Sequence, residues 1–318
     1  MQPISSQWNA FTPYYSANTT QHYLQKCYEK INVPNANQKS YENCYPFIYY
    51  IEHGQLYFQQ VENAPIAIQP ILLFYGLVHL IKACILTVDP NYPETTTVLA
   101  HGVSTRKRKK QQYSFFRDEV RYQKHGLFPF MSEKMFHVKQ LEGDKVCMGE
   151  LLQCIPELNH LYVKLEGKRS FLPVNINDHL LSVPKDILDF YHMTEERFID
   201  YFRSKSNIPF IFYQSNQEFI ILKMEKSFGP INYSPLKYDS LNQHYAISTT
   251  KSDLLYYPEL LTHYLLLYNL SMIARYEIEW WSELIKTMPN KDYPFIYSFL
   301  NISINKGPLL ILEYLDCK

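Results

Sequence analysis

The chain has 318 residues, and its 31 basic and 31 acidic side chains give a formal net charge of zero. That balance excludes a global electrostatic attraction to nucleic acids or to anionic membranes. Its six cysteines never form a CxxC pair, which argues against a disulfide framework and favours reduced thiols in a cytoplasmic protein.

The first part of the chain is predicted to be helical. Residues 16–31 carry apolar side chains at helical spacing. Residues 41–52 predict a strongly aromatic helix that stops near Gly54, and a short helix at 56–61 follows. The first residues lack a basic region followed by an apolar core, so we expect no signal peptide.

A central helix is predicted at residues 70–88, where apolar side chains cover nearly the whole circumference. Such a helix lies either in a large core or across a membrane. Its length is close to that of a membrane span, but His79 and Lys82 lie in its middle, where a cation is costly in lipid. We therefore expect a buried core helix and no membrane association.

The central helix also carries side chains that can form hydrogen bonds, namely Tyr75, His79 and Lys82. Buried polar groups must find partners. We predict that these three residues form a polar network in the core, with contact to a ligand as the alternative.

A dense basic run follows the His101-Gly102 pair, and five consecutive cations occupy residues 106–110. The candidate residues for binding a partner or an anion are His101, Arg106, Lys107, Arg108, Lys109, Lys110, Arg117 and Arg121. They would suit the phosphates of RNA or of a nucleotide, or an acidic protein surface. A solvated helix end and a nuclear localisation signal are alternatives for the run, as is a structural hydrogen-bonding role for His101.

The pattern changes along the second half of the chain. Residues 111–122 predict a helix, 126–136 an irregular apolar loop and 149–155 a short helix. From residue 159 the apolar residues alternate, in LYVKLEG among other segments, so residues 161–226 predict a small antiparallel sheet with an inserted helix. Residues 229–251 predict a loop and residues 258–285 a long helix. Residues 295–301 and 309–315 predict two short helices, or a helix and an extended tail.

These elements predict a mainly α fold of the α+β class. An N-terminal antiparallel helical bundle would span residues 1–158, with the central helix at its middle. A small β-containing insertion would follow at 159–228. The loop and the C-terminal helices at 229–318 would pack back on the bundle.

The sequence contains none of the common catalytic or cofactor motifs. GxGxxG and GxxxxGK[ST] are absent, as are HExxH and GxSxG. No histidine pairs with a cysteine at zinc spacing. Ser104 and Lys107 match SxxK, but no partner motif follows. We therefore predict no catalytic residue, no metal site and no cofactor.

Several blocks of the chain resemble a known family. The blocks are SYENCYPFIYYIEHG, PILLFYGLVHLIKACILTVDP, LAHGVSTRKRKKQ and HYLLLYNLSMIARYEIEWW. They resemble the YaaC-like family of bacterial proteins over essentially the whole chain. Members of that family in spore-forming bacteria tend to be encoded beside the gene for IMP dehydrogenase. The resemblance therefore implies a protein partner, such as this enzyme of purine nucleotide metabolism.

The chain is more distantly similar to the HEPN helical bundles, which include many RNases. The similarity lies in Phe74-Tyr75-Gly76, Lys82-Ala83 and the His101-Gly102-Val103 triplet. HEPN nucleases use an arginine followed by a histidine with four to six residues between them, and no arginine here has a histidine at that spacing. We therefore expect a non-catalytic, cytoplasmic binding or regulatory protein that acts through Leu99–Lys110. A HEPN-like RNA-binding or RNA-processing protein is the alternative.

Overall fold

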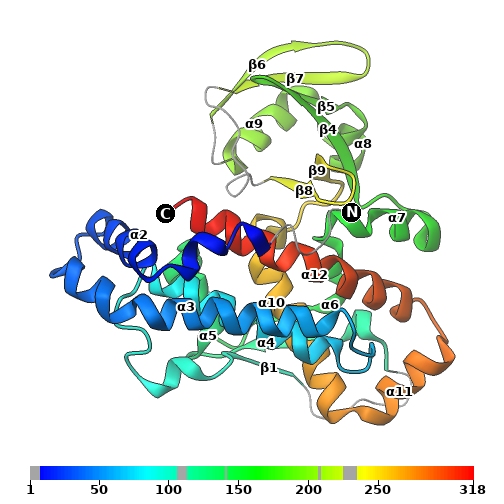
Figure 1. Cartoon of the computed structure of the whole chain (residues 1–318). Helices are drawn as coiled ribbons and strands as arrows, with labels where there is room; N and C mark the ends of the chain where they lie inside the picture. The colour runs from blue at the N-terminus through cyan, green and yellow to red at the C-terminus, as the bar shows by residue number, and fades with distance from the viewer. Residues whose placement is uncertain (1–7, 106–112, 140–141, 207–208, 225–234) are drawn as a thin grey trace. The chain divides into compact units, whose positions relative to one another are not determined.

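The structure is a computed structural model that describes residues 8–105, 113–139, 142–206, 209–224 and 235–318. It combines helices with antiparallel sheets (Figure 1), which confirms the α+β class. The chain divides into two compact units: unit 1 consists of residues 1–149 and 260–318, and unit 2 of residues 150–259. The basic run at 106–110 lies outside the described residues.

Unit 1 is built mainly from helices. They are α2 (Ala17–Lys30), α3 (Ala36–Val61), α4 (Gln69–Leu86), α5 (Leu127–Phe136), α10 (Glu259–Tyr276), α11 (Ile278–Thr287) and α12 (Asp292–Asp316). α3 and α4 run alongside each other (Figure 1), α2 packs on α3, and α12 packs on α4. Most residues of α4 are buried around its whole circumference. α4 is thus the core helix that its apolar pattern predicts.

Two of the described helices, α4 and α12, are long and apolar enough to cross a membrane by length and composition. Core helices of soluble proteins have the same properties. In α4 67% of the apolar window is buried within the protein, and in α12 61%. The two helices are therefore weak evidence for a membrane span.

The shorter helical segments connect these elements. They are η1 (Thr12–Tyr15), η2 (Thr96–Leu99), η3 (Phe115–Arg117), α6 (Met148–Gln153), η4 (Pro156–Leu158), α7 (Asn159–Leu161), η5 (Tyr162–Glu166) and η6 (Asp253–Tyr256). The predicted strand LYVKLEG is wrong, because its residues form the helical segment η5. Its alternation of apolar and polar residues extends over too few positions to distinguish a strand from a short helix.

Three predicted helix ends are also wrong. α3 continues through Gly54, which allows close packing rather than ending the helix: an added Cβ would lie 2.5 Å from Leu80 Cδ2 of α4. α12 is one helix with Pro308 inside it, not two short ones. The predicted helix 258–285 breaks at Glu277, and the indole N–H of Trp281 in α11 donates to the carbonyl oxygen of Ala67 at 2.9 Å.

The segment predicted as a helix at 111–122 contains a strand instead, because Val120 and Tyr122 alternate with exposed or half-exposed side chains. β2 (Glu119–Tyr122) pairs with β1 (Val103–Thr105) and β3 (Lys145–Cys147) in an antiparallel sheet. The predicted loop at 126–136 is the helix α5, whose buried residues recur at helical spacing. Pro129 is compatible with this helix, since a proline in the first turn costs no helix hydrogen bond.

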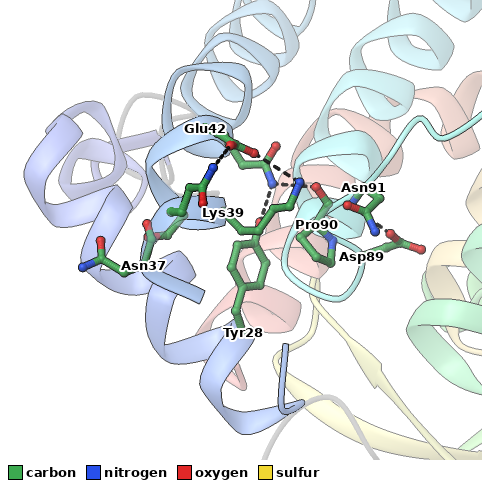
Figure 2. A network of polar contacts seen from close by, with 10 residues as sticks. Tyr28, Asn37, Lys39, Glu42, Asp89, Pro90 and Asn91 are labelled. Atoms are coloured by element: carbon green, nitrogen blue, oxygen red, sulfur yellow. Dashed lines mark hydrogen bonds and ion pairs between the residues drawn. The ribbon is translucent and has the colours of Figure 1, made fainter. Parts of the chain in front are cut away.

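A polar network ties α2, α3 and the turn after α4 together (Figure 2). The side-chain amide of Asn43 donates to the Tyr28 hydroxyl at 2.9 Å and to the Pro90 carbonyl oxygen at 2.8 Å. Nearby on α3, the Lys39 ammonium pairs with the Glu42 carboxylate at 3.2 Å. These contacts hold the N-terminal part of α3 in place.

Unit 2 contains a six-stranded antiparallel sheet with the order β6-β7-β5-β4-β9-β8 (Figure 1). Its strands are β4 (Phe171–Asn177), β5 (Leu180–Pro184), β6 (Phe210–Ser215), β7 (Phe219–Met224), β8 (Leu236–Asp239) and β9 (His244–Ser248). The helices α8 (Asp186–Tyr191) and α9 (Glu195–Lys205) pack their apolar side chains against the sheet.

The long loop predicted at 229–251 is wrong for its described part, because that part forms the hairpin of β8 and β9. The Asp239 carboxylate accepts hydrogen bonds from the backbone N–H groups of Leu241 and Asn242 at 3.0 and 2.9 Å, and Gln243 has a positive φ. Such Asx turns close hairpins without glycine. With these strands included, unit 2 extends to residue 259.

Candidate functional site

Polar and aromatic side chains gather in unit 1 where α3, α4 and α10 meet the turn at His101. We name this group the aromatic–cationic cluster; its members are Tyr50, His53 and Tyr57 of α3, Tyr75, His79 and Lys82 of α4, His101, and Tyr268 and Arg275 of α10. Most of them are half-buried, whereas Tyr268 is buried and His53 is exposed.

Rings from α3 and α4 stack on one another across the helix pair. The His79 ring lies 5.6 Å from the Tyr57 ring and 5.3 Å from the His53 ring, with interplanar angles of 20° and 28°. Tyr57 also stacks on Tyr75 at 6.2 Å. Residues four apart are neighbours on a helix surface, so two such pairs on packed helices form a stack. Gly76 permits the approach, because an added Cβ would lie 2.9 Å from the Phe58 ring.

The His101 turn is held by its backbone. The His101 carbonyl oxygen accepts from the Phe128 N–H at 3.1 Å and from the buried Tyr264 hydroxyl at 2.8 Å. Gly102 has a φ of +77°, and an added Cβ would lie 2.4 Å from Pro129 Cδ. Glycine adopts this conformation without a steric cost. The His-Gly pair is therefore a tightly packed turn that fixes the position of the imidazole. The His101 ring centroid lies 5.6 Å from that of Tyr268.

Two cations approach the rings from opposite helices. The Arg275 guanidinium donates to the Tyr75 hydroxyl at 3.0 Å and to the Ser271 carbonyl oxygen at 3.1 Å. The Lys82 ammonium lies 5.7 Å from the Tyr50 ring centroid. Within the described part of the chain, neither cation pairs with a carboxylate. Aromatic faces stabilise both cations. Their positive charges remain available to bind an anion.

His79 of α4 and His101 of the turn both favour their neutral forms. Burial, with the charges of Lys82 and His53, lowers the pKa of His79 to about 4. Burial, with the charges of Arg275 and Lys82, also lowers the pKa of His101. The buried His79 Nδ1 has no hydrogen-bond partner among the described residues. At neutral pH the cluster therefore offers neutral imidazoles beside two cations, and a bound anion would favour their protonation.

These features suit a ligand that has both a flat ring and a negative charge. Stacked rings bind a planar group through their faces, and a half-buried guanidinium forms strong charge-assisted hydrogen bonds with phosphate or carboxylate. A metal centre has no comparable support, since no group of three or more His, Cys, Asp or Glu that could hold an ion occurs among the described residues.

The structure brings some of the predicted site residues together and separates others. Tyr75, His79 and Lys82 share the cluster with His101, although no hydrogen bond joins these four side chains to one another in the described chain. Arg117 and Arg121 are exposed on η3 and β2, and no described contact joins them to the cluster. The predicted residues Arg106, Lys107, Arg108, Lys109 and Lys110 lie outside the described residues.

Sequence reasoning missed the contributions of α3 and α10, above all Arg275. An arginine shortly before a histidine is a pattern within one segment. Arg275 does not fit that pattern, because it lies far from His101 in the sequence and comes near it only in the folded chain. One signal was present: Tyr268 and Arg275 lie seven residues apart, and therefore on one face, of a helix whose charged residues are Glu259 in the first turn and Arg275 in the last. A lone cation on such a face needs a partner or a function.

The lowered pKa of His79 predicts how acid affects stability. Its value of about 4 lies below the ordinary 6.5, so between these pH values the unfolded chain binds a proton that the folded chain does not. Stability should therefore fall as the pH falls through this range. In His79→Phe, which keeps a ring for the stack on Tyr57, thermal melts should show a smaller decline.

His22→Phe is the matched control, because His22 is exposed on α2. The groups facing His79 are Tyr50, His53 and Tyr57 of α3 and Lys82 of its own helix. None is a carboxylate, so no acid offsets the effect. An equal acid-side decline in His79→Phe and in the unmodified protein would contradict the prediction.

The sequence was compared with protein families, curated proteins and solved structures. A family model described as YaaC-like Protein matches residues 12–315. No curated protein and no solved structure matches the chain. The match covers both units and includes every residue of the cluster.

Proposed function

The chain belongs to the YaaC-like family, and from that premise we propose that it is a binding protein for a nucleotide, either free or as part of an RNA chain. One observation carries the proposal: Lys82 and Arg275 are half-buried beside stacked rings, with no carboxylate partner in the described chain. A base would lie against the rings and the phosphate would reach the cations. The neutral form of His101 leaves a further hydrogen-bonding group at the same place.

This proposal relates to both functions that the sequence suggested. It retains the predicted binding role, with RNA or a nucleotide as the ligand. This agrees with the alternative based on similarity to HEPN bundles, which includes the helix that carries Tyr75 and Lys82. The hypothesis of a protein partner such as IMP dehydrogenase, bound through Leu99–Lys110 in the cytoplasm, stays a prediction. Leu99 is exposed at 45%, as a contact residue would be, and residues 106–110 lie outside the described part.

Titration calorimetry tests the proposal with four probes: AMP, GMP, adenosine and inorganic phosphate. We expect each nucleotide to bind more tightly than adenosine or phosphate, because only the nucleotide uses both the rings and the cations. Lys82→Gln and Arg275→Gln should each weaken nucleotide binding. A hydrogen bond to a charged group contributes about 1.5–3 kcal/mol, which corresponds to roughly a ten- to hundredfold rise in Kd.

Exposed cations provide the matched controls: Lys26→Gln on α2 and Arg197→Gln on α9 remove the same charges elsewhere. Their nucleotide affinity should equal that of the unmodified protein. If the two cluster variants bind as tightly as these controls, the nucleotide does not use the cluster and the proposal fails.

A second candidate function is RNA cleavage, favoured by the effect of the Arg275 charge on His101. A neutral imidazole can accept the proton of a ribose 2′-hydroxyl while its oxygen attacks the adjacent phosphate; the bond from phosphorus to the 5′ oxygen of the next nucleotide breaks, and that oxygen takes a proton from water. A guanidinium stabilises the charge that develops on the phosphate. Incubation of end-labelled RNA with the protein and with His101→Gln tests it. Fragments that depend on His101 would support cleavage, and intact RNA in both samples would contradict it.

A further inference from the structure

Three tyrosines on one row of α3 project into solvent. Tyr41, Tyr45 and Tyr49 recur every four residues and are 67%, 54% and 54% exposed; we name them the tyrosine row. One turn further the same row reaches His53, which stacks on His79 in the aromatic–cationic cluster at 5.3 Å. Because residues four apart are neighbours on a helix surface, the tyrosine row leads directly into the cluster.

The dimensions of the row fit a short polymer rather than a single small molecule. The Tyr45 and Tyr49 ring centroids lie 6.0 Å apart with an interplanar angle of 33°. A rise of about 1.5 Å per residue separates Tyr41 from His53 by about 18 Å. At about 3.4 Å per stacked nucleotide, this length accommodates roughly five nucleotides.

The charges around α3 distinguish the uncharged tyrosine row from the cationic cluster. The row itself is uncharged, and Glu42 on the adjacent row is already paired with Lys39 at 3.2 Å (Figure 2). Glu52 is three residues from Tyr49 and therefore neighbours it on the helix surface, so one exposed carboxylate borders the row near His53. Lys82 and Arg275, which pair with no carboxylate among the described residues, lie in the cluster. Neutral rings for bases beside a cationic anchor for phosphate are what single strands use on proteins.

Resting on the proposed function, we propose that the ligand is a single-stranded nucleic acid. One nucleotide occupies the aromatic–cationic cluster, and the bases that follow stack on Tyr49, Tyr45 and Tyr41. The competing use of the row is packing against a second copy of this chain, and the experiment separates the two.

Fluorescence anisotropy with labelled oligoadenylates of one, three, six and twelve nucleotides tests the inference. Affinity should rise with length and level off at roughly five nucleotides. A Tyr45→Ala, Tyr49→Ala double variant should lose on the order of tenfold in hexamer affinity per ring, while its affinity for the monomer stays unchanged. The Tyr45→Phe, Tyr49→Phe variant keeps both rings and should bind the hexamer like the unmodified protein.

Tyr293→Ala, Tyr297→Ala is the matched control, because these α12 residues form a similar stacked pair at 5.9 Å. It should keep the full length dependence. Equal affinity for monomer and hexamer would overturn the inference and leave the proposed function standing. No binding to either would overturn both. The row could instead be an interface between copies of the chain. In that case only the Tyr45→Ala, Tyr49→Ala variant would elute as a monomer, and affinity would not depend on oligonucleotide length; this result would overturn the inference.

Discussion

Replacing Gly76 with leucine is expected to separate α3 from α4 and to lower the free energy of unfolding by about 3 kcal/mol or more. An added Cβ at Gly76 already lies 2.9 Å from Phe58 Cδ2 and 3.0 Å from Tyr57 Cβ. Phe58 is fully buried and cannot move aside without disturbing the core. Chemical denaturation followed by circular dichroism measures the change.

Gln60→Leu places the same side chain at an exposed position of α3 and serves as the control. It should change the free energy of unfolding by less than about 0.5 kcal/mol. The stacking of Tyr57 on Tyr75 depends on the same helix approach, so Gly76→Leu should also abolish nucleotide binding. A Gly76→Leu protein with unchanged stability would show that α3 and α4 do not pack as described.

Changing Gly102 to alanine is expected to cost about 2–4 kcal/mol of stability and to displace His101. Two effects add at this position. The φ of +77° is unfavourable for any residue with a Cβ, and that Cβ would lie 2.4 Å from Pro129 Cδ and 2.9 Å from the Phe128 backbone nitrogen. Thermal melts measure the loss of stability, and calorimetry with AMP should show the loss of binding.

Gly143→Ala separates the two effects. Gly143 also has a positive φ, of +89°, but an added Cβ would have no neighbour within 4 Å. This control should therefore cost only the backbone strain, about 1–2 kcal/mol, and should leave AMP binding unchanged. Equal losses in the two variants would mean that the turn at Gly102 is not crowded.

Helices with long apolar patterns were the elements that the sequence could predict. α4 was predicted within two residues at each end, because the prolines that bound its apolar pattern fix where the helix begins and ends. The errors occurred where tertiary packing overrides local signals. Gly54 allows a close approach to Leu80 instead of ending α3, and the Asp239 turn closes a hairpin whose strands are too short to show alternation.

The candidate site could be predicted only in part. Tyr75, His79 and Lys82 were visible as polar exceptions on an apolar helix, and His101 as part of a His-Gly pair. The contact between these residues and Arg275 could not be predicted, because it depends on how α10 packs against α4. Sequence spacing describes neighbours on one helix, and it carries no information about a contact between residues 75 and 275.

The division of unit 1 has a consequence for synthesis on the ribosome. Its first 149 residues emerge before unit 2, whereas α10 and α12 emerge after it. Until then α4 lacks the helix α12 that packs on it, and its apolar surface remains open to aggregation or to chaperones. Arg275 and Tyr268 lie on α10, which also emerges after unit 2. A nascent chain would therefore lack the proposed nucleotide site until α10 has been synthesised.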